Sequence, residues 1–404
     1  MRIETVLHRR ILGAVGSLHK VRAAALSAAV MSLSYGAFLT VTALGRGLRS
    51  GAKAKHNIKR IDRVLSNRAL HRERHSIYQA LCRRLCQGLR YPVILVDWSD
   101  IVEQERMRVI RAALSVNGRA IPLYEAVYPL KRYNKPRTHE LFLETLRRLL
   151  PSECIPVVVT DAGFRGPWFR SVERLGWHWL GRVRNDINYR VVSVGVWSAA
   201  KTLYRKANSR VRYIGQCELS SKRPYGCHLY LYKKRNQHTK SKRSTYHKAK
   251  HSGSAVFSKQ QRDPWLLATD MGPEFMSGPR IIEMYRRRMG IEAAFRDLKS
   301  DRFGFGLTLA RTRDIERLNV LLLIAALTTV CLWWVGLVAR EQGWQKDFQA
   351  NTVRDRPVLS VPFLALQVLR RVDYEVPLPE LLRAQWLLEQ HIRDVHQQLF
   401  RGDL

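Results

Sequence analysis

Acidic residues are scarce in this sequence. Its 404 residues contain 33 Asp and Glu against 70 Lys and Arg, which gives a formal net charge of +37. Self-repulsion at such a charge opposes the compact state, which argues against a soluble enzyme of small metabolites. A polyanion would screen the charge, and nucleic acid is the obvious one. Ribosomal proteins share the charge but are usually shorter and less apolar, whereas 46% of these residues are hydrophobic, enough for folded cores.

Metal-binding cysteine patterns are also missing. The six cysteines include no CxxC pair, and no His or Cys partners have the spacing of a four-ligand structural zinc site. Cys82 and Cys86 lie four residues apart, on one face of an expected helix. The sequence therefore predicts free thiols in a reducing cytosol and excludes a disulfide-stapled secreted fold.

Two apolar stretches resemble membrane spans. The first, Ala23 to Gly45, contains several Ser and Thr residues and a break near Tyr35-Gly36, which predicts two short helices. The second, Val320 to Ala339, is long enough to cross a bilayer, although a helix buried on all sides has the same composition. We favour burial, because a single span near the C-terminus would leave the rest of so basic a chain unexplained. No membrane partner is predicted.

The length predicts two to three structural units. Changes of pattern along the chain indicate a helical N-terminal region, an α/β region, a β-rich basic insertion, a further helical part of the core and a helical C-terminal region. Their predicted boundaries are 1–88, 89–185, 186–277, 278–340 and 341–404.

The N-terminal region has the pattern of a DNA-binding module. Arg22 to Leu33 and Thr40 to Arg49 could form a helix-turn-helix pair, with Thr40 or Thr42 as the N-cap. Lys53 to Arg74 follows as a helix with an apolar stripe and a basic outer face. The alternative interpretation of this face is a solvated charged surface. The basic residues that we expect to contact DNA are Lys55, Lys59, Arg60 and Arg63.

The α/β region places two aspartates after buried strands. Pro92 to Trp98 contains Asp97 at its end, and Ile155 to Thr160 runs into Asp161. Between them, Asn117-Gly118 is a strong hairpin signal joining two β-rich runs. The predicted order β-β-β-α-β-α-β is typical of a mixed sheet with helices on its faces. Open α/β sheets collect ligand sites at the carboxyl ends of strands, where both aspartates are expected.

The β-rich insertion contains four short β-like segments, YRVVSV, VRYIGQCEL, CHLYLY and PWLLAT, and a long basic loop. Between Glu218 and Asp263 there is no acidic residue, and Tyr232 to Lys250 contains eight Lys and Arg. A loop that follows DNA phosphates and a solvated, disordered linker both fit this composition.

A third carboxylate stands on a predicted helix from Ile281 to Lys299. At 100° per residue, Arg288 lies about 40° from Glu292 around the helix, and Tyr285 and Lys299 each lie about 20° from it. Glu292 therefore shares a face with a phenol, a guanidinium and an ammonium, whereas Glu283 is on the opposite side. The alternative for this helix alone is an amphipathic surface helix with ion pairs.

This set of side chains suits phosphodiester chemistry. Three carboxylates, Asp97, Asp161 and Glu292, can hold two Mg²⁺ ions, for which Mn²⁺ can substitute, while leaving coordination sites for a substrate. Arg288 and Lys299 would then bind phosphates on either side of the metal ions.

The same residues resemble a known family. The two aspartates and the run Y-x2-R-x3-E-x6-K formed by Tyr285, Arg288, Glu292 and Lys299 look like the insertion-sequence-four family of bacterial DDE transposases, closest to the Tn-ten type. The likeness extends over nearly the whole chain, through KHNIKRIDRVLSN (55–67), ILVDWSD (94–100), VTDAGFRGPW (159–168) and QANTVRDR (349–356).

The resemblance implies an RNase H-like catalytic core interrupted by the β-rich insertion before the Glu-bearing helix. It implies cut-and-paste transposition of double-stranded DNA, with cleavage at terminal inverted repeats, a hairpin intermediate and strand transfer into target DNA. It also implies that Tyr285, Arg288 and Lys299 contact DNA. It further implies a homodimer that holds two DNA ends, dimerisation through residues 341–404, and a bacterial cytoplasmic, nucleoid-associated location.

One position departs from the family pattern. Some relatives carry a Trp directly after the signature Arg, where it stacks on a flipped base, and this chain has Met289 there. Trp98 and Trp265 are candidates for that role, although core packing is the commoner role of such residues.

Three other interpretations stay open at this point. One is an inactive DNA-binding remnant of a transposase, which the intact carboxylates and the Tyr-Arg-Glu-Lys set argue against. The others are a structure-specific nuclease that cuts without joining, and a membrane protein suggested only by Val320 to Ala339.

Overall fold

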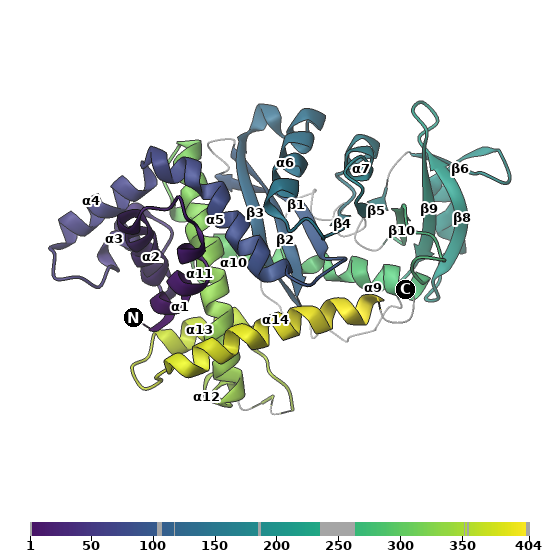
Figure 1. The fold of residues 1–404 in the computed structure, drawn as a ribbon. Coiled ribbons are helices and arrows are strands. Elements are labelled where there is room, and N and C mark those ends of the chain that lie inside the picture. Colours follow the sequence, from purple (N-terminus) through teal and green to yellow (C-terminus); the bar gives the residue numbers. More distant parts are fainter. Residues whose placement is uncertain are drawn as a thin grey trace, which may run out of the picture. The chain divides into compact units, whose positions relative to one another are not determined.

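The computed structural model describes residues 2–102, 107–116, 118–184, 187–234, 263–350, 352–353 and 355–400. The described chain is a mixed α/β structure (Figure 1). It divides into two compact units. Unit 1 comprises residues 1–157 and 287–398, and unit 2 comprises residues 158–286 with the last residues of the chain. The chain passes between the units at residues 157–158 and 286–287, inside predicted regions and not at their boundaries. The five predicted regions stay a prediction.

Unit 1 begins with five helices, as the sequence indicates. Their bounds are α1 Arg2–Arg10, α2 Lys20–Ser34, α3 Val41–Arg46, α4 Ala54–Leu65 and α5 Arg68–Cys86. Thr40 caps α3, because its side chain accepts a hydrogen bond of 3.1 Å from the backbone N–H of Ala43. The predicted break after α2 is confirmed: Gly36 has a φ of +102°, which favours glycine.

The predicted single helix from Lys53 to Arg74 is wrong. It is two helices, because the chain stops at Ser66 and Asn67 caps a new helix by accepting a hydrogen bond of 3.0 Å from Leu70 N–H. The apolar stripe holds: Ile61 and Leu65 are fully buried. The break redirects the chain between α4 and α5 and leaves α4 as a separate basic helix.

The sheet of unit 1 is an antiparallel meander. Its strands are β1 Val93–Val102, β2 Met107–Val116 and β3 Arg119–Pro129, in the order β3-β2-β1. Helix α6, Pro136–Leu149, follows the meander. The strand that we expected to end near Trp98 continues to Val102, because pairing with β2 persists through Asp100 opposite Arg108. Asp97 therefore lies inside a paired strand rather than at its end, which corrects the prediction.

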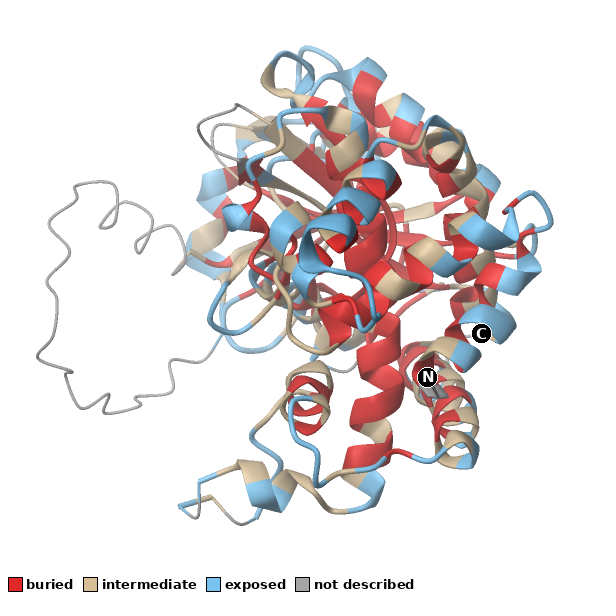
Figure 2. Cartoon of the chain, turned by 90° about the vertical axis from the view of Figure 1, so that its left-hand side faces the viewer, coloured by how far each residue is buried: buried red, intermediate tan, exposed pale blue. Residues whose placement is uncertain are grey.

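The C-terminal part of unit 1 is helical. Its helices are α10 Met289–Lys299, α11 Ile315–Glu341, α12 Gln345–Phe348, α13 Val361–Leu369 and α14 Leu378–Phe400. Helix α11 is long and apolar enough to cross a membrane, but 89% of its most apolar window is buried inside the structure (Figure 2). It packs against α2, α13 and β3. The segment from Val320 to Ala339 is thus a core helix of unit 1, the interpretation favoured from the sequence.

Unit 2 contains β4 Val157–Thr160, whose first residue belongs to unit 1, and then strands and helices of mixed length. Its further elements are α7 Gly166–Glu173, β5 His178–Val183, β6 Asn188–Val191, β7 Trp197–Ala199, β8 Arg212–Leu219, β9 Tyr225–Tyr232, β10 Trp265–Thr269 and α9 Gly278–Arg287. Within it the strand order is β4-β5-β10-β9-β8-β6-β7. The predicted alternation through β5 and the four expected β segments of the insertion are confirmed, and the short β7 was not anticipated.

The basic segment that follows β9 falls, beyond residue 234, outside the described residues. The predicted helix from Ile281 to Lys299 is present but interrupted: α9 ends at Arg287 and α10 begins at Met289, with Arg288 between them. Unit 2 ends at Arg286, so the signature helix contributes Tyr285 to unit 2 and Arg288, Glu292 and Lys299 to unit 1.

Candidate active site and nucleic-acid surfaces

Asp97 occupies the middle of β1, where its backbone pairs with Arg111 of β2. Its side chain is 17% exposed, and its Oδ1 accepts a hydrogen bond of 2.8 Å from the backbone N–H of Trp98. The residues before it, Val93 to Val96, are fully buried. A buried strand thus holds the Asp97 carboxylate near solvent. Its Oδ1 is engaged by the backbone, and its Oδ2 can contact other side chains.

One guanidinium contacts two of the three predicted carboxylates. Arg288 Nη1 lies 3.6 Å from Asp97 Oδ2, and Arg288 Nη2 donates a short hydrogen bond to Glu292 Oε1. The Glu292 side chain is 45% exposed, whereas that of Arg288 is 13% exposed. Asp97 and Glu292 are 195 residues apart in sequence, yet both contact the same cation. The two carboxylates therefore meet at one guanidinium within unit 1.

Lys299 reaches the same strand from the other end of α10. Its Nζ donates hydrogen bonds of 2.9 Å to Ser99 Oγ and 3.1 Å to the Asp100 carbonyl. Burial lowers the pKa of Lys299, and the nearby Asp100 carboxylate opposes that shift. Arg108 makes a 2.6 Å ion pair with Asp100. A row of cationic groups therefore runs along the solvent edge of β1 beside Asp97.

Close packing places α10 over the meander. A Cβ added at Gly290 would lie 2.8 Å from the Arg119 carbonyl oxygen, so only glycine lets the helix approach β3 this closely. Below the helix, Arg111 makes a fully buried ion pair of 2.7 Å with Glu125, and its guanidinium lies 4.4 Å from the centre of the Phe295 ring. These contacts fix the height of α10, and with it the position of Glu292, above the strand that bears Asp97.

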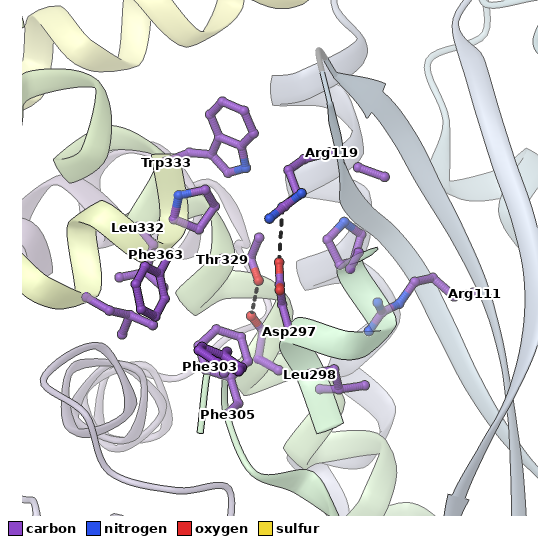
Figure 3. A pocket seen from close by; sticks show the side chains of 17 residues that line it. Arg111, Arg119, Asp297, Leu298, Phe303, Phe305, Thr329, Leu332, Trp333 and Phe363 are labelled. Carbon is purple, nitrogen blue, oxygen red and sulfur yellow. Dashed lines mark hydrogen bonds and ion pairs between the residues drawn. The ribbon is translucent and has the colours of Figure 1, made fainter. Parts of the chain in front are cut away.

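A small cavity lies beside α10, lined by Arg119, Asp297, Trp333 and Phe363 among others (Figure 3). Its volume is about 30 Å³, which is roughly the share of liquid volume of one water molecule. Arg119 and Asp297 close one side with an ion pair of 3.3 Å. The cavity is too small for a substrate, and it is a gap in the packing beside α10.

Asp161 and Tyr285 belong to unit 2. Asp161 directly follows β4, as the sequence predicted, and its Oδ1 accepts a hydrogen bond of 2.8 Å from the Gly163 backbone N–H. A Cβ at Gly163 would lie 3.0 Å from the same oxygen, so the turn needs a small residue. Tyr285 is buried, and its ring meets Trp265 edge-on with centroids 5.0 Å apart. Tyr285 therefore serves in packing within unit 2.

The basic helix α4 presents its cations to solvent. Lys55, Lys59, Arg60 and Arg63 are all exposed. The acid on this helix, Asp62, is engaged by Arg317 at 2.6 Å. A Cβ at Gly45 would lie 2.5 Å from the Ile58 Cα, so α3 and α4 cross in close contact. The four predicted DNA-contacting residues thus share an accessible helix whose own carboxylate is already paired.

The two candidate tryptophans are held in aromatic clusters. Trp98 donates a hydrogen bond of 3.1 Å from Nε1 to His139 Nε2 and meets Tyr133 edge-on at 5.3 Å. Burial lowers the pKa of His139 to about 4, which keeps the imidazole neutral and able to accept this bond. Trp265 packs between Tyr285 and Tyr232. Both tryptophans therefore pack against neighbouring aromatic side chains within their own units.

Comparison with known proteins decides the family. A family model described as "Transposase DDE domain" matches residues 88–329, more than half of the chain. The chain belongs to the transposase DDE-domain family. The matched range includes Asp97, Asp161 and Glu292, and this transposase is therefore a DDE-type enzyme of DNA transposition.

Two further comparisons complete the picture. A solved structure titled a piggyBac transposase synaptic complex with hairpin DNA is similar over 95% of this chain and 76% of that chain, with 9% identity and a TM-score of 0.39. No curated protein matches the sequence.

Members of this family generally use divalent metal ions, and the donors of this transposase fit such an ion. Carboxylate oxygens are the ligands that Mg²⁺ prefers, and Asp97 and Glu292 already share one cationic partner in unit 1. Over the described residues, no three His, Cys, Asp or Glu side chains gather around one point. The third predicted ligand, Asp161, belongs to unit 2.

Several residues beside the site escaped the sequence reasoning. Ser99 and Asp100 hold Lys299, and Arg108 pairs with Asp100. Their signal in the sequence is the alternation of β1, which places Asp97 and Ser99 on one face, two residues apart. The register with β2 that brings Arg108 to Asp100 depends on pairing and is not visible in either strand alone.

Proposed function

We propose that this transposase moves DNA by a cut-and-paste mechanism and that Asp97, Asp161 and Glu292 form its catalytic triad. In this proposal the core is RNase H-like and the protein is of the insertion-sequence-four, Tn-ten-like type. The observation that carries the proposal is the meeting of Asp97 and Glu292 at one guanidinium, 195 residues apart in sequence. Two carboxylates that converge on one cation could also converge on a metal ion, and carboxylate-held metal ions carry out phosphodiester cleavage.

The three carboxylates would hold two Mg²⁺ ions, which Mn²⁺ can replace; bound metal would activate the attacking oxygen and stabilise the leaving one. Asp97 would supply the fixed ligand from within a paired strand. Arg288 and Lys299 would bind and orient phosphate oxygens, the first through its planar fork and the second as a point charge. Because Arg288 contacts both carboxylates, it would have to exchange partners before it could hold a phosphate.

The DNA substrate in this proposal is double-stranded, namely the terminal inverted repeats and the target. The exposed α4 residues would contact the backbone of the element ends, and Tyr285 would contact DNA together with Arg288 and Lys299. Cleavage would proceed through a hairpin intermediate, with two protomers holding two ends. The enzyme would act in the bacterial cytoplasm on nucleoid DNA.

The test uses a plasmid carrying the inverted repeats that flank the coding sequence. It is incubated with purified protein and Mg²⁺, comparing the wild type with Glu292→Gln. Glu283→Gln, on the opposite side of the signature helix, is the matched control. Cutting at the ends by wild type and Glu283→Gln but not by Glu292→Gln supports the assignment. Equal cutting by all three places the activity elsewhere, and cutting without joined products indicates a nuclease rather than a transposase.

A further inference from the structure

Unit 2 contains a cavity that the proposed chemistry does not use. Its volume is about 600 Å³, and one of the residues that line it is Ala162, which directly follows Asp161 in sequence. Three separate segments form its walls: the start of α7, the end of β5 and the turn between β8 and β9. Six cationic residues line it and, among the described residues, no acidic one. The six are Arg165, Arg170, Arg182, Arg184, Lys222 and Arg223.

The cations are held by the fold rather than scattered on a surface. Arg182 is only 9% exposed, and its Nη2 donates hydrogen bonds to the carbonyls of Asp263 and Pro264 at 3.0 and 3.3 Å. Its Nε is buried and has no hydrogen-bond acceptor among the described residues. Burial and the neighbouring Arg184 both lower the pKa of Arg182. Gly181 of β5 faces Phe169 of α7, so the alternation of the strand turns the Arg182 side chain to the other face of the sheet. Arg182 therefore adds to the positive charge of this part of unit 2 without pointing at α7.

The floor of the cavity is aromatic and in close contact with a helix start. A Cβ at Gly166, the first residue of α7, would lie 2.9 Å from Tyr225 Cε1. Arg170 lies over the Tyr225 ring at 5.7 Å. Backbone N–H groups at the start of a helix favour anions, and here Arg165 and Gly166 border the cavity. Cations, helix amides and an aromatic ring meet at one hollow.

The size of the hollow selects its ligand. A volume of about 600 Å³ falls within the range of about 300–1,000 Å³ that suits a small molecule or a short segment of chain. The major groove of a DNA duplex is by itself about 12 Å wide, so a whole duplex cannot enter. A single strand can, and proteins bind single strands through a basic groove with aromatic support.

We propose that this cavity binds the sugar–phosphate backbone of an unpaired DNA strand, next to the loop that carries Asp161. The inference rests on the proposed function, because it gives the strand released at a cut end a place on the enzyme. Arg165, Lys222 and Arg223 are the exposed members of the set, and they meet the strand first. Arg170, which lies over the Tyr225 ring, binds the phosphate that goes deepest.

The test compares the affinity of the full-length protein for two labelled duplexes by fluorescence anisotropy. One duplex is blunt, and the other carries a single-stranded overhang of about four nucleotides. The pocket variant is Lys222→Gln with Arg223→Gln. The matched control is Arg205→Gln with Lys206→Gln, which removes the same charge from exposed residues of unit 2 that do not line the cavity.

The wild type and the control should prefer the overhang by about 10-fold, and the pocket variant should lose most of that preference while its affinity for the blunt duplex changes no more than the control's. An overhang preference that survives in the pocket variant overturns the proposal. So does equal binding of both duplexes by the wild type, which would mean a surface for duplex phosphates. Inorganic phosphate that stabilises the wild type, without any overhang preference, would identify a free-anion site and also overturn it.

End cleavage by the same preparations separates this inference from the function beneath it. If cleavage requires Glu292 but the pocket variant keeps the overhang preference, the cavity proposal alone fails. If Glu292→Gln cuts as well as the wild type, the proposed function fails whatever the cavity binds.

Discussion

The candidate active site of unit 1 and the cavity of unit 2 differ in how their charges are balanced. In unit 1, the acids near the candidate active site are paired with cations: Asp97 and Glu292 with Arg288, Asp100 with Arg108, and Glu125 with Arg111. In unit 2, six cations surround one cavity that no described acid lines. Paired charges describe a site whose partners exchange during a reaction, whereas an unbalanced cluster describes a site that waits for an anion. The net charge of +37 is therefore distributed unevenly: it is locally balanced at the candidate active site and unbalanced around the cavity of unit 2.

Removing a carboxylate from unit 1 should give the largest effect. Asp97→Asn is expected to lower the rate of end cleavage by about 10³-fold or more, because a neutral amide is a poor metal ligand and several kcal/mol of transition-state stabilisation are lost. Gel-based cleavage kinetics with Mg²⁺ would measure it. The overhang preference of the same variant should match the wild type. A variant that loses both would show that the two units do not divide the work in this way.

The buried ion pair of unit 1 should be the most sensitive point for stability. Glu125→Gln leaves the Arg111 guanidinium buried without its counterion and is expected to cost about 3–5 kcal/mol. Urea unfolding monitored by circular dichroism would measure the loss. The double replacement Arg111→Met with Glu125→Leu removes both charges and should recover most of it. Equal destabilisation by the single and double variants would mean that shape, not charge, matters there.

Acid should weaken unit 1 before it weakens the cation cluster of unit 2. Burial lowers the pKa of both His139 and His396 to about 4, against an ordinary value of about 6.5. The unfolded chain therefore binds protons that the folded chain excludes, so this stability is complete above about pH 6.5 and is lost as the pH falls toward 4. The loss at pH 5 is about 2 kcal/mol for each histidine.

Urea unfolding at about pH 7 and about pH 5 would measure this loss. His139→Gln should flatten the dependence by about half. A stability that does not change between these pH values, or one that rises with acid, would contradict the shifts.

The smallest effect should come from the exposed helix α4. Lys59→Gln with Arg63→Gln is expected to reduce the slope of log affinity against log salt concentration by about 2 for duplex DNA carrying the element ends. Arg147→Gln with Arg148→Gln, on the exposed side of α6, is the matched control. A titration at several salt concentrations would give both slopes. If the α4 variant and the α6 control gave the same slope, α4 would not contact DNA and its basic face would be a solvated surface.

The sequence predicted which elements carry the candidate site residues better than it predicted where those elements begin and end. Alternating apolar runs were enough to place Asp97 and Asp161 on or after strands, since burial period and strand length are local properties. The extent of β1 was not local: pairing with β2 carries it to Val102. The helix breaks at Asn67 and Arg288 were also missed, because the polar pattern continues through both and only capping and packing separate the segments.

The cation cavity of unit 2 could not have been found from the sequence. Its six basic residues come from three segments between Arg165 and Arg223, each unremarkable in so basic a chain. Only the packing of α7 against the β8–β9 turn, through Tyr225 and Gly166, brings them to one hollow. By contrast, Arg288 and Glu292 stand one helical turn apart, and that spacing was sufficient to predict their contact.

The interior position of Asp97 in β1 gives the active site an uneven stiffness. Residues on both sides of Asp97 are paired with β2, so the carboxylate can adjust only by rotation of its side chain. Glu292 lies in the first turn of α10, just after the interruption at Arg288, where the helix is freest to move. Amide hydrogen exchange should therefore be slow at residue 97 and faster at residue 292. We therefore expect Asp97 to stay in place when a substrate binds. We expect Glu292 to move with the start of α10, so that the helix side of the site adapts to substrates of different shape.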